Sequence, residues 1–207
     1  MCYDGCITKA GIPRFFRKEE HPMHNKNEAA LRQPRTVLLA GCVCGVIASI
    51  AQPWYILSCI LYALTAVLFG VGCFLARGLQ AEFTTGWRVA AVTALVFIAA
   101  AALHTFGMTL LMALIGGLAL YFCVTFATSA MARALGAMPS GETRRPPRVA
   151  ILFEYCAGIY MLASLGADAF PSLSFLADMI SMVSLGVGFA LVAKFVMTVK
   201  TGQGGEG

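Results

Sequence analysis

The chain has 207 residues, of which 59% are apolar and 12% are charged, and its formal net charge is +5. Soluble globular domains are about 45–50% apolar and about 25% charged, so this composition excludes a soluble globule. The apolar content also excludes an intrinsically disordered chain. The class that fits is a polytopic membrane protein, with the lipid bilayer as its main partner and no nucleic acid.

Three apolar blocks follow one another along the chain, and each is too long for a single membrane span. As one helix, the first block, 36–76, would reach about 61 Å, whereas the hydrocarbon core is about 30 Å thick. Polar or helix-breaking residues interrupt the blocks near their middles, at Gln52-Pro53, His104 and Asp168 to Pro171. We therefore expect six spans, at 36–52, 54–76, 87–104, 108–132, 149–167 and 172–198.

These spans predict an all-α fold, a polytopic transmembrane helical bundle of three helical hairpins with both termini in the cytoplasm (N-in/C-in). All 15 basic residues of the chain then lie on the cytoplasmic side, as the positive-inside rule requires. We expect flexible cytoplasmic segments at 1–35 and 200–207, with either Met1 or Met23 as the start. A bacterial cytoplasmic (inner) membrane is the expected location.

Ionisable residues within spans need an explanation, because each costs about 2.5–3.5 kcal/mol on insertion scales. Glu154 and Lys194 are expected at similar depth near the cytoplasmic ends of the last two spans. They form either a structural ion pair or a site where Lys194 controls a proton or cation held by Glu154. Tyr121 and Thr125 recur at helical spacing and would complete a polar pocket with Glu154, unless they bond within their own helix.

The opposite leaflet has its own polar group, made of Asp178, His104 and Asp168. An imidazole with two carboxylates suits a transition metal or a proton relay. The alternative is ordinary helix-end polarity, with Asp178 bonded to serines of its own helix. The first interpretation makes Asp178 a candidate for a polar pathway through the membrane, and the second gives it no such role.

A weaker candidate metal site lies at the N-terminus, where Cys2, Cys6, His21 and His24 have the spacing C-x3-C-x14-H-x2-H. Thiolate and imidazole ligands suit zinc, but the last spacing is short and Pro22 separates the histidines. The cysteines within the spans are expected to be packing residues. The sequence predicts no cofactor.

Two functions from different classes are consistent with these features. The first is a small transport or permeation protein for an ion or small solute that uses intramembrane carboxylates. The second is a non-catalytic accessory or regulatory subunit of a membrane complex, or a protein of membrane stress response. In size and span number the chain resembles the HdeD acid-resistance membrane proteins.

We expect no enzyme, because the common catalytic motifs are absent. Small residues such as Gly41 and Gly45 favour close helix packing, within one bundle or in a homo-oligomer.

Overall fold

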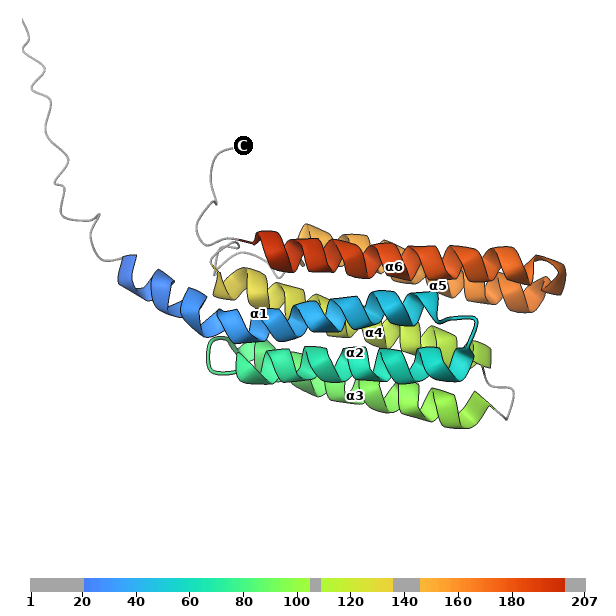
Figure 1. Ribbon diagram of the computed structural model, residues 1–207, viewed down its shortest axis with the longest axis horizontal. Helices are drawn as coiled ribbons and strands as arrows, with labels where there is room; N and C mark the ends of the chain where they lie inside the picture. Colours follow the sequence, from blue (N-terminus) through green and yellow to red (C-terminus); the bar gives the residue numbers. More distant parts are fainter. Residues whose placement is uncertain (1–20, 105–108, 136–145, 200–207) are drawn as a thin grey trace, which may run out of the picture.

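The computed structural model describes residues 21–104, 109–135 and 146–199, with side chains from residue 30 onward (Figure 1). This part of the chain is helical and contains no strand. Its elements are α1 (His21–Ile50), α2 (Tyr55–Leu75), α3 (Ala81–Leu103), α4 (Thr109–Ala134), α5 (Arg148–Ala169), the short 3-10 helix η3 (Pro171–Leu173) and α6 (Ser174–Thr198). All six α-helices are long and apolar enough to cross a membrane.

The six helices lie side by side along the long axis of the molecule (Figure 1). Each packs against the next one in the chain, and α6 returns to pack against α1, so that the helices form a closed ring. Contacts across the interior of the ring are few and involve α4 with α2 and with α6. The centre of the ring is therefore filled by side chains.

Large aromatic side chains fill this centre, and four of them press against a glycine of a neighbouring helix. Phe69, Phe97, Phe153 and Phe189 are all at most 4% exposed. A Cβ atom added at the glycine would lie 3.0 Å or less from the ring, which shows how closely the backbone approaches. We call these pairs the four Phe–Gly contacts: Phe69 with Gly41, Phe97 with Gly116, Phe153 with Gly188, and Phe189 with Gly45.

The outward surface of the ring is apolar. Ile47, Leu95 and Leu162 are 50%, 64% and 69% exposed, and similar side chains are exposed on all six helices. Soluble monomers rarely expose contiguous apolar patches larger than a few hundred Å². Together with the lengths of the helices, this surface is compatible with an integral membrane protein.

The observed helices end within two residues of the expected spans, apart from two helix starts. α1 begins at His21, so it includes 21–35 of the N-terminal segment that was expected to be flexible. Leu31, Pro34 and Leu38 are buried, and a Cβ atom at Gly72 of α2 would contact both Leu38 and the Pro34 carbonyl. This packing extends the helix past the apolar block. The tail 200–207 and residues 1–20 lie outside the described part.

α3 likewise begins early, at Ala81 instead of residue 87. Phe83 is fully buried and Gly86 is packed against Cys73 of α2, so the first two turns belong to the core. Glu82 in the same turns forms an ion pair with Arg133 at the end of α4. Hydropathy missed these turns because all their residues except Phe83 are polar or small, although their inward face is packed.

Candidate functional site

The charged side chains divide between the two ends of the bundle. Every Lys and Arg whose side chain is described lies toward the end where α1 begins and α6 ends, which we call the basic end. These residues are Arg32, Arg35, Arg77, Arg88, Arg133, Arg148 and Lys194. The other end carries Asp168 at the end of α5 and Asp178 near the start of α6, and we call it the acidic end. The bundle is thus electrostatically polarised along its axis.

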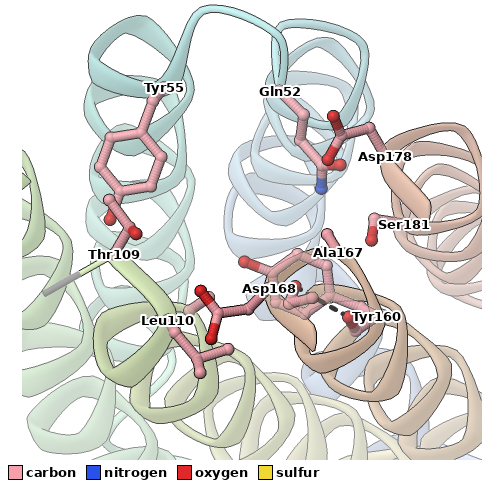
Figure 2. Close-up of a pocket in the computed structure, with 11 residues that line it drawn as sticks. Gln52, Tyr55, Thr109, Leu110, Tyr160, Ala167, Asp168, Asp178 and Ser181 are labelled. Atoms are coloured by element: carbon pink, nitrogen blue, oxygen red, sulfur yellow. Dashed lines mark hydrogen bonds between the residues drawn. The ribbon is translucent and has the colours of Figure 1, made fainter. Parts of the chain in front are cut away.

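A cavity of about 290 Å³ opens at the acidic end, between the end of α1 and helices α2, α4, α5 and α6 (Figure 2). We call it the Asp178 cavity. Its lining residues are Gln52, Tyr55, Thr109, Leu110, Ala113, Tyr160, Ser164, Ala167, Asp168, Asp178 and Ser181. Both aspartate side chains are exposed, so the cavity communicates with the outside of the protein.

Helical spacing on α5 and α6 places the polar groups of the cavity. Tyr160, Ser164 and Asp168 are four residues apart on α5, so they share one face. Asp178 and Ser181 are three residues apart on α6 and share another. In Figure 2 the Asp178 side chain extends toward Gln52 and the Asp168 side chain toward Leu110, so the carboxylates come from different walls.

Hydrogen bonds lead from the cavity toward the centre of the ring. Gln52 Nε2 donates to the Tyr62 hydroxyl at 3.3 Å, and that hydroxyl lies 3.1 Å from Ser49 Oγ. Ser49 Oγ donates to the Gly45 carbonyl at 2.9 Å, so the hydroxyl of Tyr62 is the donor to Ser49. The chain of bonds ends at Gly45, which is the partner of Phe189 in one Phe–Gly contact. Below this point the centre is closed by packed rings.

The expected group of Asp178, Asp168 and His104 is brought together in part. The two aspartates line one cavity, as described above. His104 does not line it, but its ring stacks on Tyr55, which does, with 4.5 Å between the ring centroids. His104 Nδ1 is buried and has no hydrogen-bond partner in the described part of the chain. Within that same part, no three His, Cys, Asp or Glu side chains cluster as metal ligands would.

Comparisons with protein-family models, curated proteins and solved structures found no match to this chain. The chemistry of the Asp178 cavity is therefore the basis for assigning a function. Its carboxylates attract cations, its hydroxyls and amide offer hydrogen bonds, and its tyrosine rings offer apolar and π surfaces.

Glu154 and Lys194 do not form the ion pair considered above. Both side chains are exposed, and the one ion pair within 21–104, 109–135 and 146–199 joins Glu82 to Arg133. Neither Glu154 nor Lys194 lines the Asp178 cavity.

Glu154 does have the polar neighbours that the sequence suggested. Tyr121 on α4 lies beside both Glu154 and Thr125. Thr125 Oγ1 is buried, and no described group completes a hydrogen bond with it. These three residues form a separate polar group between α4 and α5, away from the Asp178 cavity. We call it the Glu154 group.

The zinc candidates fall outside what the structure describes. Cys2 and Cys6 lie outside the described residues, and His21 and His24 lie in the first turn of α1 without described side chains. The six cysteines from Cys42 onward are free thiols, and five of them are buried.

Sequence reasoning missed the residues that complete the cavity, chiefly Gln52, Tyr55, Tyr160 and Ser164. The spacing of Tyr160, Ser164 and Asp168 was the available signal, because a repeat of four puts three polar groups on one face of a span. Gln52 was interpreted only as a helix break. Its role depends on the contact between α1 and α6, which no local pattern indicates.

Proposed function

We propose that this chain is an integral membrane protein that moves an ion or small solute across the bilayer through the centre of its helix ring. The observation that supports this most directly is the Asp178 cavity. It is an open polar site at one end of a ring whose centre is filled by buried aromatic side chains. An acidic group within a span is costly and is usually retained for function. No catalytic step is part of the proposal.

The proposed topology is six spans in three hairpins, with both termini in the cytoplasm of a bacterial cell and the Asp178 cavity on the opposite side. The positions of the basic side chains support this orientation, because all those described lie toward the end where α1 begins and α6 ends. The solute would therefore reach the cavity from outside the cytoplasm.

Transport through this site requires a rearrangement of the aromatic centre. Phe97 and Phe189 pack against Tyr62, with ring centroids 5.1 Å and 6.3 Å apart, directly below the hydrogen-bonded floor of the cavity. Phe189 also packs against Phe153, at 5.2 Å. The described arrangement thus corresponds to a state that is open at the acidic end and closed below it.

The test is flux in proteoliposomes that contain only this protein. Currents after concentration jumps of sodium, potassium or ammonium chloride are recorded on a supported membrane, and lumenal pH is followed with a trapped dye. We expect flux of at least one of these ions, reduced about tenfold or more in Asp178→Asn, as for loss of a charged interaction worth about 1.4 kcal/mol. Glu154→Gln, which removes a carboxylate outside the cavity, is the matched control. Absence of any flux, or equal flux from Asp178→Asn, contradicts the proposal.

The Glu154 group supports a second function, that of an accessory or regulatory subunit. An exposed Glu154 about 9 Å along α5 is costly against lipid. A polar group on a partner helix would offset that cost, and α5 is the least buried of the six spans. This function predicts a stably bound partner or a homo-oligomer that is lost in Glu154→Leu. A monomer that transports on its own would contradict it.

A further inference from the structure

The charges around the Asp178 cavity favour a cationic ligand. Neither Asp168 nor Asp178 has an ion-pair partner among the residues that the structure describes. All the described basic side chains lie toward the opposite end of the bundle. Two carboxylates that line one cavity, far from the described basic groups, attract positive charge and disfavour an anion.

The walls of the cavity favour an organic cation over a bare metal ion. A metal ion needs several ligand atoms that converge on one point. No such group of three acidic, cysteine or histidine side chains exists in the described ranges. The cavity instead has the rings of Tyr55 and Tyr160 on two sides, which suit the carbon skeleton of an ammonium compound through cation–π and apolar contact.

One residue of the cavity is largely buried, yet its hydroxyl has no hydrogen-bond partner among the described residues. Ser181 is 4% exposed, lines the cavity, and none of the described hydrogen bonds uses its Oγ atom. The neighbouring Ser164 differs, because its Oγ already donates to the Tyr160 carbonyl at 3.0 Å. The Ser181 Oγ atom is not fully enclosed by protein, so it is open to a partner in the cavity. Because Ser181 lies one helical turn from Asp178, a ligand N–H group held by the carboxylate can also reach this oxygen.

Size sets the remaining limit. The cavity volume of about 290 Å³ lies at the lower edge of the range of about 300–1,000 Å³ for small-molecule sites. We propose that the Asp178 cavity binds a small primary ammonium compound with one positive charge. Its N–H groups lie between the Asp178 carboxylate and Ser181, and its carbon skeleton lies against Tyr55 and Tyr160. This inference deepens the proposed function and rests on it.

The test uses two probes with the same atoms and charge, butylammonium and tetramethylammonium, of which only the first has N–H groups. Binding to the full chain in a non-ionic detergent is measured by calorimetry at constant ionic strength, with sodium and potassium as the inorganic comparison. We expect both ammonium ions to bind more tightly than sodium or potassium, and butylammonium more tightly than its isomer. This comparison needs no variant and so does not depend on the folding of a mutant.

Two variants then locate the ligand. Asp178→Asn weakens both ammonium ions about tenfold or more, because each loses its charge partner. Ser181→Ala weakens butylammonium several-fold and leaves tetramethylammonium unchanged, because only butylammonium has an N–H to donate. The matched control is Ser184→Ala, since Ser184 lies in a separate apolar groove between α5 and α6 and donates to a carbonyl of its own helix.

Equal affinity for sodium and butylammonium overturns the inference, as does a Ser181→Ala effect that is the same for both isomers. The outcomes also separate this inference from transport itself. Flux of sodium or potassium that depends on Asp178, without ammonium binding, overturns the inference and leaves the proposed function standing. Ammonium binding with the expected pattern but no flux of any ion overturns transport and supports the ligand assignment.

Discussion

Gly45→Ala tests whether the Phe–Gly contacts hold the ring closed. The new Cβ atom would lie 2.7 Å from two ring carbons of Phe189, well inside ordinary contact distance. Phe189 is fully buried and packed against Tyr62 and Phe153, so its ring has no room to retreat. Overpacking of this kind costs about 1–3 kcal/mol. Alanine recovers about 0.5–1 kcal/mol of helix propensity, which leaves a net loss of about 0–2.5 kcal/mol.

The matched control is the same substitution at Gly158 of α5, where an added Cβ atom meets nothing within 4 Å. Only the propensity term remains there, so Gly158→Ala should be neutral or stabilising by up to about 1 kcal/mol. The propensity term is common to both substitutions, so the predicted difference between their unfolding free energies is the overpacking cost alone, about 1–3 kcal/mol.

Thermal unfolding in detergent can be followed with a thiol-reactive fluorogenic dye, because Cys42, Cys73 and Cys123 are at most 2% exposed in the folded protein. Cys2 and Cys6 are replaced by serine so that the signal comes from the described cysteines. At about 2–4 °C per kcal/mol for a chain of this size, we expect Gly45→Ala to unfold several degrees below Gly158→Ala. If Gly45→Ala unfolds at or above the temperature of Gly158→Ala, the argument from the Phe–Gly contacts is wrong.

Three further predictions concern other parts of the molecule. Tyr62→Phe leaves Gln52 without its acceptor and should destabilise the protein by about 0.6 kcal/mol, and at most about 1.7, in the same thermal assay; no change would mean that the cavity floor is held by packing alone. Glu82→Gln and Arg133→Gln should each destabilise the protein by less than about 1 kcal/mol, because the ion pair is about a quarter exposed and therefore weak. A double-mutant cycle should give a measurable coupling energy, and strictly additive effects would argue against the pair. A cysteine introduced at Ser172 should react with an impermeant maleimide from outside the cell, whereas one at Thr201 should not; the reverse pattern would invert the topology.

The sequence alone determines the helices of this protein well. Proline and polar residues mark the interruptions, so most helix ends lie within two residues of the expected positions. The early starts of α1 and α3 were missed because hydropathy reports how apolar a segment is. It does not report whether a helix continues past the apolar segment. Leu31 and Phe83 show what extends these helices, since each is buried against a neighbour.

The candidate site is only partly accessible to sequence reasoning. Asp178 stands out because ionisable residues are rare in spans, and Asp168 because it belongs to the polar interruption of the third apolar block. The cavity that joins them to Gln52 depends on how α6 closes the ring against α1, and that contact joins distant parts of the chain. The Glu154–Lys194 pair illustrates the same limit. Similar expected depth on neighbouring helices suggested a pair, but both side chains are exposed and form no ion pair.

The Phe–Gly contacts connect the stability of the ring with the closed state of its centre. Between Gln52, just beyond the end of α1, and Gly45 the interior changes from hydrogen-bonded polar groups to packed aromatic rings. The polar groups on this path bond to one another within the bundle. Under the proposed transport function, a solute in the Asp178 cavity would go further only if Phe189 left Gly45. The free energy that this contact adds to the fold would then also add to the barrier for passage. Weakening the contact, as in Phe189→Leu, should both lower the unfolding temperature and raise the rate of flux. A change in only one of these two quantities would show that the contact does not both stabilise the fold and block the passage.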